Sequence, residues 1–133
     1  MEITVQELRN LDQDSYQIID MRDETEISHG SIPNAVHMSA EEIEKVIENQ
    51  TEGVFSREKK LVICCARGRV SVDVAEALCE EGYDAVSLQG GYIAWLLDTM
   101  KQQEADDICA EVEQSIRKKF HKPIWSKFTK AIN

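Results

Sequence analysis

The sequence predicts an α/β fold in which helices flank a central, mostly parallel sheet. Short apolar runs alternate along the chain with stretches of helical periodicity, and this alternation is typical of βαβ units. The most apolar run, residues 61–64, indicates a central strand that is covered on both faces. With 133 residues, of which 42% are hydrophobic, the chain has the size of one ordinary domain and enough apolar residues for a core.

The first half of the chain contains helix signals that alternate with short apolar runs. Thr4 and Ser39 each stand three residues before a glutamate, and this capping-box pattern predicts a helix directly after each of them. An acid-rich helical turn is expected between these helices, over residues 23–29. Strands are expected on either side of that turn, at residues 17–20 and 35–38.

The second half continues the alternation and ends in helices. After the central strand we expect a helix over residues 71–81 and then a strand at 85–88. Gly90-Gly91 is expected to turn the chain into a further helix, followed by an amphipathic helix over about 102–119. A last short helix is expected over residues 124–132.

Two of these helices have a single apolar side, which predicts that they cover the sheet. In the helix after Ser39 the apolar residues are Ile43, Val46 and Ile47. In the helix over 71–81 they are Val74, Ala75, Leu78 and Cys79.

Charge is distributed unevenly along the chain. The net charge is −10, but residues 1–114 hold 9 Lys and Arg against 25 Asp and Glu. Residues 115–133 hold 6 Lys and Arg and no acidic residue. This asymmetry indicates a boundary near Ser115 or a basic arm with a partner of its own.

The hydropathy, the amino terminus and the cysteines indicate where in the cell the protein is expected. No apolar run approaches the roughly 20 residues that span a bilayer, and the start lacks the pattern of a signal peptide. We therefore expect a cytoplasmic protein with reduced cysteines and no membrane partner. There is no Cys-x-x-Cys pair or Cys/His cluster, so no metal is expected. Cys64, Cys79 and Cys109 are expected to be small buried residues.

Residues 65–71 carry the chemistry. A parallel strand that ends at Cys65 would deliver the thiol to the carboxyl edge of the sheet, where open α/β folds place their sites. The following backbone N–H groups, the start of a helix near Ser71, and the charges of Arg67 and Arg69 all favour a thiolate. Cys65 is therefore expected to have a lowered pKa and to be nucleophilic at neutral pH.

This segment, Cys65-Ala66-Arg67-Gly68-Arg69-Val70-Ser71, resembles the active-site loop of rhodanese domains. Three more segments are similar to family motifs, in the family's order: the Asp-x-Arg-x-x-x-Glu stretch at 20–26, Gly-Ser-Ile-Pro-Asn-Ala at 30–35 and Gly-Gly-x-x-x-Trp at 90–95. The resemblance covers about residues 3–98. Val70 stands where the family often has arginine, which weakens the expected binding of thiosulfate.

The resemblance implies a rhodanese-like three-layer fold of about five strands over residues 1–98, followed by a basic helical extension over 99–133. It also implies a sulfurtransferase in which Cys65 accepts sulfane sulfur as a persulfide and passes it to a nucleophile, without metal or organic cofactor. The donor would be thiosulfate or a persulfide, and a protein is a further possible donor or acceptor.

The resemblance also implies roles for the residues around Cys65. Substrate-binding residues are expected along the whole loop, at Ala66, Arg67, Gly68, Arg69, Val70 and Ser71. Ser71 is expected in addition to cap the helix that follows. Asp20, Arg22 and Glu26 are expected to give structural support. Asp20 and Arg22 are expected to be a structural pair and not catalysts, with Arg22 in an ion pair with Glu26 and Asp20 holding neighbouring N–H groups.

The last residues, 124–133, resemble the approach to the ATP-binding domain of PP-loop tRNA-thiolation proteins of the 2-thiocytidine type. This resemblance implies that the chain is part of a longer fusion protein and that residues 99–133 are a linker to a further domain. The sulfur would then serve tRNA thiolation, and the basic arm would lie near RNA.

Two other functions are compatible with the same fold class. A Cys-based phosphatase or arsenate reductase would need arginine at the sixth residue after its cysteine, but Ser71 follows Cys65 and Val70 follows Cys64 at that spacing. A non-catalytic binding module would use the fold only as a scaffold. Retention of Cys65 with its glycine and arginine neighbours favours the sulfurtransferase.

Overall fold

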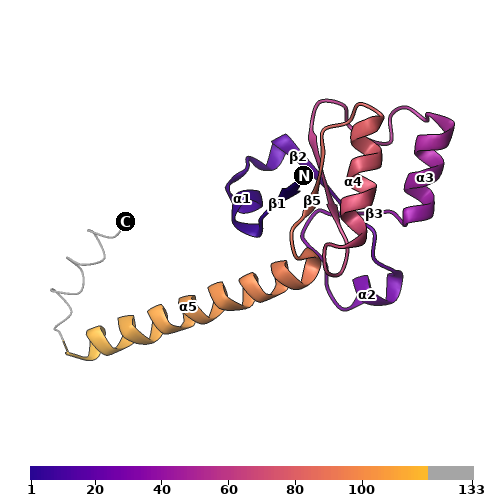
Figure 1. The fold of residues 1–133 in the computed structure, drawn as a ribbon. Coiled ribbons are helices and arrows are strands. Elements are labelled where there is room, and N and C mark those ends of the chain that lie inside the picture. Colours follow the sequence, from indigo (N-terminus) through magenta and orange to yellow (C-terminus); the bar gives the residue numbers. More distant parts are fainter. Residues whose placement is uncertain (120–133) are drawn as a thin grey trace. The chain divides into compact units, whose positions relative to one another are not determined.

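The computed structural model describes residues 1–119 and confirms the predicted α/β fold (Figure 1). A sheet of five strands has the order β1-β5-β4-β2-β3, and every neighbouring pair is parallel. The strands are β1 (Glu2–Ile3), β2 (Tyr16–Asp20), β3 (Val36–His37), β4 (Lys60–Cys64) and β5 (Ala85–Leu88). The sequence pattern did not locate β1, because two residues are too few to show a period.

The helices are α1 (Val5–Asn10), α2 (Glu24–Ser28), α3 (Ala40–Asn49), α4 (Val70–Glu80) and α5 (Gly91–Lys119), with a 3-10 turn, η1 (Gln13–Ser15). Helices α1 and α3 begin directly after the predicted caps, Thr4 and Ser39. Thr4 forms the expected capping box: its hydroxyl accepts from the N–H of Glu7, and the Glu7 carboxylate accepts from the N–H of Thr4, both at 3.1 Å. The Ser39 hydroxyl caps α3 by accepting from the N–H of Glu42 at 3.2 Å.

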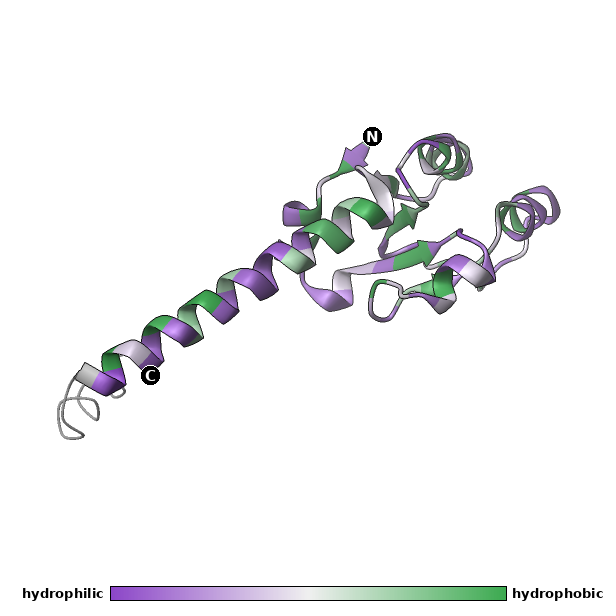
Figure 2. Ribbon diagram, turned by 90° about the horizontal axis from the view of Figure 1, so that it is seen from below, coloured by the Kyte–Doolittle hydropathy of each residue, from purple (hydrophilic) through white to green (hydrophobic). Residues whose placement is uncertain are grey.

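The two helices expected after Gly91 form one continuous helix, α5. The chain divides into two compact units, and the second unit begins at Asp98 within this helix. Beyond Asp98, α5 carries mainly hydrophilic residues, with a few hydrophobic ones between them (Figure 2). The helix expected over 124–132 lies outside the described residues. Within residues 1–119 no helix is long and apolar enough to cross a membrane.

Strand β4 is the centre of the core. It lies between β2 and β5, and residues 61–64 are completely buried, as the sequence predicts. On one face, Leu61 and Ile63 belong to a cluster that is covered by α3 and α4 (Figure 1). On the other face, Val62 and Cys64 pack with residues of β2, β5 and α1. Because both faces are covered, the end of β4 is a rigid support for Cys65.

An ion pair at the carboxyl end of β2 holds the next segment in place. Asp20 and Arg22 are only 1% and 6% exposed, and two nitrogens of Arg22, Nη2 and Nε, donate to the Asp20 carboxylate at 2.8 and 3.1 Å. Arg22 Nη2 also donates to the carbonyl of Gly30 at 2.8 Å, and the guanidinium stacks on the ring of Tyr92 at 3.8 Å. The pair therefore fastens residues 22–30 to the sheet and to the start of α5.

The expected Arg22–Glu26 ion pair is wrong. Arg22 reaches only the backbone carbonyl of Glu26, at 3.5 Å, and the Glu26 side chain is exposed. The reason is that Asp20 lies closer and is buried with Arg22, so its carboxylate takes the guanidinium. Burial lowers the pKa of Arg22, but the hydrogen bond and charge of Asp20 outweigh burial and raise it, so the guanidinium keeps its charge.

Replacing Arg22 should destabilise the protein strongly. Arg22→Met leaves the Asp20 carboxylate buried without its partner, and such a loss costs about 3–5 kcal/mol of the free energy of unfolding. Urea denaturation followed by circular dichroism measures the change.

The matched control is Arg57→Met. Arg57 also stacks on a tyrosine, but its ion pair with Glu52 is exposed, so the expected loss is about 1 kcal/mol or less. The double variant Asp20→Asn/Arg22→Met should lose less than Arg22→Met, because no charge remains buried. Equal losses in Arg22→Met and Arg57→Met would contradict the assigned role of the buried pair.

Candidate active site

Cys65 follows directly after β4, at the carboxyl edge of the sheet. The residue is 9% exposed, and its sulfur is surrounded by hydrogen-bonding groups. The backbone N–H of Gly68 donates to Sγ at 3.1 Å, and the hydroxyl oxygen of Ser71 lies 3.2 Å from Sγ. When the sulfur is a thiolate, the Ser71 hydroxyl can donate to it.

These donors lower the pKa of Cys65. Burial alone acts in the opposite direction and raises it, since a buried thiolate loses water. The side chain of Ser71 and the backbone N–H groups of Ser71, Gly68 and Val70 together outweigh burial. Val70 and Ser71 are the first residues of α4, so the positive end of that helix faces the sulfur. The site can therefore hold a sulfur anion.

The prediction that Ser71 caps α4 is wrong. The helix begins one residue earlier, at Val70, and Arg69 occupies the cap position without a side-chain hydrogen bond. Ser71 thus lies inside the first turn, is completely buried, and turns its hydroxyl to Cys65.

Behind Ser71 lies a residue that the sequence reasoning missed. The hydroxyl of Ser87 on β5 is 2.6 Å from the hydroxyl of Ser71, and Ser87 is completely buried. The two serines form a short chain of hydroxyl groups that ends at the Cys65 sulfur. A serine within the apolar strand 85–88 was the available signal, since a buried hydroxyl requires a partner.

The start of α5 supports the back of the loop. The N–H of Tyr92 donates to the carbonyl of Cys65 at 2.8 Å, and the N–H of Ile93 donates to that of Ala66 at 3.1 Å. Gly91 has a positive φ of 62°, and a Cβ there would overlap the carbonyl oxygens of Cys65 and Ala66. Glycine is therefore required for this close approach.

A cavity of about 360 Å³ opens beside Cys65. Its walls come from the loop after β4 and from the segment after β2, and it is lined by Met21, Arg22, Asp23, Glu26, Cys65, Ala66, Arg67, Arg69 and Val70. Of the expected substrate-binding residues, Gly68 and Ser71 contact the sulfur and are not among the residues that line the cavity. Arg67 and Arg69 line it and are exposed. Neither arginine is among the causes of the lowered pKa of Cys65: burial raises that pKa, and hydrogen bonds from Ser71, Gly68 and Val70 lower it.

The other cysteines differ from Cys65. Cys64 belongs to the core, and burial, with the charge of Asp20, raises its pKa to about 12. Cys79 is half-buried, whereas Cys109 is exposed, so the expectation that Cys109 is buried is wrong. The reason is that α5 beyond Asp98 belongs to a separate unit, where neighbouring residues are exposed as well. Among residues 1–119, no group of three or more His, Cys, Asp or Glu side chains could hold a metal ion.

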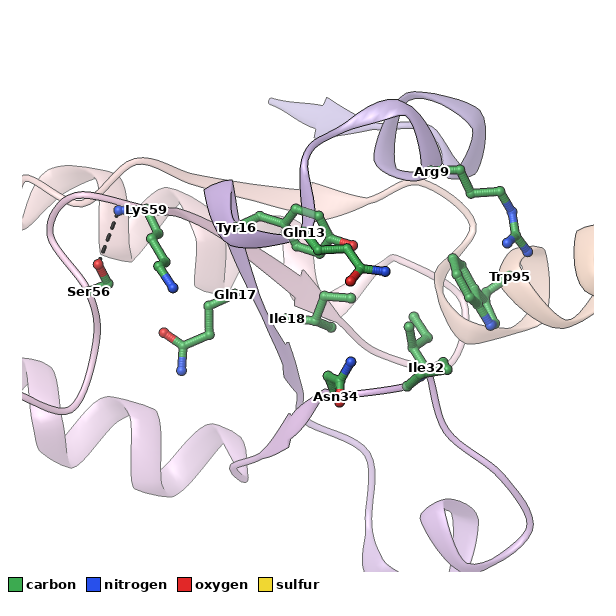
Figure 3. Close-up of a pocket in the computed structure, with 11 residues that line it drawn as sticks. Arg9, Gln13, Tyr16, Gln17, Ile18, Ile32, Asn34, Ser56, Lys59 and Trp95 are labelled. Carbon is green, nitrogen blue, oxygen red and sulfur yellow. Dashed lines mark hydrogen bonds between the residues drawn. The ribbon is translucent and has the colours of Figure 1, made fainter.

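A larger cavity, of about 710 Å³, lies away from Cys65 (Figure 3). It borders residues 16–18, the amino-terminal part of β2, whereas Cys65 follows the carboxyl end of the parallel strand β4. Lys59 and Gln17 extend into it, and the backbone N–H of Lys59 donates to the hydroxyl of Ser56 at 3.1 Å (Figure 3). None of the described residues that line it is a cysteine, so it is separate from the candidate site.

Comparisons with known proteins agree with this fold. The family model of the rhodanese-like domain matches residues 4–98. Over 82 residues the chain is 37% identical to the thiosulfate sulfurtransferase GlpE of Shewanella oneidensis, covering 61% of this chain and 76% of the relative.

Two solved structures share the fold. A rhodanese-like domain protein from Staphylococcus aureus is similar with a TM-score of 0.59 and 35% identity, covering 71% of this chain and 89% of that one. A rhodanese-related protein from Thermoplasma volcanium is similar with a TM-score of 0.62 and 27% identity, covering 73% and 91%.

Removing the Ser71 hydroxyl should make Cys65 less reactive at neutral pH. In Ser71→Ala the pKa of Cys65 rises, because a hydrogen bond to a charged group contributes about 1.5–3 kcal/mol. The thiolate is present above the pKa and is lost as pH falls through it, so this loss begins at a higher pH in the variant. Alkylation of Cys65 by iodoacetamide, followed by peptide mass spectrometry, should slow about tenfold or more at neutral pH.

The control is Ser71→Thr, which keeps a hydroxyl and should retain most of the reactivity. A pH profile that is the same in wild type and Ser71→Ala would show that the hydroxyl does not stabilise the thiolate.

Proposed function

Because the chain belongs to the rhodanese-like domain family, we propose that it is a sulfurtransferase that carries sulfane sulfur as a persulfide on Cys65. The observation that carries this proposal is the position of Cys65, which lines an open cavity. Hydrogen bonds from the loop to its sulfur lower the pKa of the Cys65 thiol. A thiolate is the reactive form of cysteine, and a persulfide anion would need the same donors.

The proposed reaction has two steps. The Cys65 thiolate attacks the outer sulfur of thiosulfate or of a persulfide. The S–S bond of the donor breaks, and sulfite or a thiolate leaves with the electron pair while a new S–S bond forms at Cys65. An acceptor nucleophile then attacks the outer sulfur, and Cys65 leaves as a thiolate. Sulfur is exchanged between nucleophiles throughout, so no external oxidant or reductant is consumed.

The backbone N–H groups and the arginines of the loop after β4 have different roles in the proposed reaction. The N–H groups of Gly68, Val70 and Ser71 stabilise the thiolate before attack and again when it leaves in the second step. Arg67 and Arg69, at the rim of the cavity, would attract an anionic donor.

The arrangement gives less support to a phosphatase. The sixth residue after Cys65 is Ser71, whose buried hydroxyl contacts the sulfur, so that position supplies no guanidinium to grip a tetrahedral oxyanion. A non-catalytic module would have no need for a lowered pKa at a cysteine that lines a cavity.

As the acceptor system we propose tRNA thiolation. The support is the resemblance of residues 124–133 to the approach of a PP-loop ATP-binding domain and the excess of basic residues over 115–133. Basic residues favour a polyanion such as tRNA. The acceptor would then be a PP-loop domain in the same polypeptide or a separate protein.

The carrier role predicts a specific mass change. After incubation of the full chain with thiosulfate or glutathione persulfide and removal of the donor, the Cys65 peptide should gain the mass of one sulfur. Cys65→Ser should gain none and should lose thiosulfate:cyanide activity. Cys64→Ser is the matched control and should still load, since Cys64 is buried and its pKa is raised. Loading or turnover that is undiminished in Cys65→Ser would reject the proposal.

The acceptor proposal predicts transfer to RNA. The chain, loaded with isotopically labelled sulfur on Cys65, should form labelled thionucleoside when mixed with a PP-loop tRNA-thiolation protein, ATP and tRNA. Nucleoside mass spectrometry measures the product, and Cys65→Ser is the control. Loaded chain that gives up its sulfur to small thiols but never to tRNA would contradict the acceptor while leaving the sulfurtransferase intact.

A further inference from the structure

The chain of two serine hydroxyls behind Cys65 is closed at its inner end. The Oγ of Ser71, in the first turn of α4, lies 3.2 Å from the Cys65 sulfur, and the Oγ of Ser87, on β5, lies 2.6 Å from that of Ser71. Both serines are completely buried. Within residues 1–119 the Ser87 hydroxyl has no hydrogen-bond partner other than Ser71. The chain can therefore act on the sulfur alone.

Such a chain has a direction, because each hydroxyl donates one proton. If Ser71 donates to the sulfur, Ser87 can donate to Ser71, and both protons have an acceptor. If Ser71 instead donates to Ser87, the Ser87 proton has no acceptor among the described residues, at a position that is completely buried. A buried donor without an acceptor costs free energy. The direction from Ser87 through Ser71 to Cys65 is therefore the stable one.

The charge of Cys65 decides how well this direction is used. A thiol that donates its own proton to Ser71 reverses the chain and leaves the Ser87 proton without an acceptor. A thiol that accepts from Ser71 does so weakly, because neutral sulfur is a weak acceptor. A thiolate is charged and accepts strongly. Only the thiolate thus satisfies both serines fully.

Strand β5 keeps Ser87 in place. Its backbone N–H donates to the carbonyl of Met1 at 3.1 Å, and on the other side of β5 Ser87 lies opposite Ile63 of β4. Because both neighbouring strands hold the backbone of Ser87, its side chain has a fixed origin next to the start of α4. The Ser87 hydroxyl is therefore a fixed partner for Ser71.

We propose that Ser87 is a positioning residue, which orients the Ser71 hydroxyl so that it donates to the Cys65 sulfur. Ser87 does not line the cavity beside Cys65, so it acts through Ser71 and not on a substrate. The same direction serves both steps of the proposed reaction, since Cys65 attacks as a thiolate and later leaves as one. The inference rests on the proposed role of Cys65 as the nucleophile.

The test follows the alkylation of Cys65 by iodoacetamide over a range of pH, with peptide mass spectrometry as the readout. Ser87→Ala removes the inner hydroxyl and leaves Ser71 free to turn away from the sulfur. Alkylation at neutral pH should slow about two- to fivefold, because the remaining hydrogen bond is weaker. The thiolate is lost as the pH falls through the pKa of Cys65, so the half-maximal rate should move to a higher pH. The shift should be smaller than in Ser71→Ala, which removes the direct donor.

The double variant Ser71→Ala/Ser87→Ala distinguishes an indirect role from a direct one. If Ser87 acts through Ser71, the double variant has the same pH profile as Ser71→Ala, and the two effects do not add. The double variant should also be more stable to urea than Ser71→Ala, because Ser71→Ala leaves the Ser87 hydroxyl buried without a partner.

The matched control for packing is Ala85→Gly. Ala85 is two residues before Ser87 on β5, so the two side chains share one face of the strand, and Ala85 is buried as well. Ala85 has no hydroxyl to contribute. Its replacement should lower the stability to urea and leave the pH profile of Cys65 alkylation unchanged. A profile that moves as far in Ala85→Gly as in Ser87→Ala would mean that packing, and not the hydroxyl, sets the reactivity.

Two further results would overturn the inference. An unchanged profile in Ser87→Ala would show that Ser71 needs no orienting partner, and additive effects of the two serines would show that Ser87 acts by another route. Alkylation requires no sulfur donor, so these results are independent of sulfur transfer. A shifted profile in a chain that never forms a persulfide would reject the proposed function and leave the role of Ser87 standing.

Discussion

A buried thiolate is stable only if hydrogen-bond donors replace the water that it loses. At Cys65 burial raises the pKa, and the donors of Gly68, Val70 and Ser71 more than reverse that effect. Each donor depends on backbone conformation: Gly68 has a φ of 80°, and the other two residues begin α4. The chemistry of the site therefore depends on a loop that must keep one shape.

The rest of the first unit holds that shape. Strand β4 is buried on both faces and fixes the start of the loop, α4 fixes its end, and the first turn of α5 binds its carbonyls from behind. Ser87 on β5 gives the Ser71 hydroxyl a buried partner, so the hydroxyl does not need water. The Asp20–Arg22 pair holds the facing wall of the cavity by binding the carbonyl of Gly30. The contacts that shape the loop around Cys65 are thus also contacts that hold the fold together.

The charged residues near Cys65 line the cavity and do not set the pKa of the thiol. Arg67 and Arg69 were expected to help stabilise the Cys65 thiolate, but hydrogen bonds alone lower its pKa, against the effect of burial. Arg67 and Arg69 line the cavity together with Asp23 and Glu26, and all four side chains are exposed. In a chain with a net charge of −10, a cavity with balanced charges is a local feature that the overall composition does not reveal.

The sequence by itself determined the features that depend on neighbours a few residues apart. These include the caps at Thr4 and Ser39, the apolar sides of α3 and α4, and the buried strand that ends before Cys65. Tertiary structure decided which residues distant in the chain are in contact. It also decided between partners that local spacing does not distinguish. Arg22 pairs with the buried Asp20 and not with Glu26. Ser71, buried where α4 packs on β5, is a hydrogen-bond partner of the Cys65 sulfur and not the cap of α4. Spacing along a chain defines helices and strands, but the partner of a buried polar group is known only when all the surrounding elements are in place.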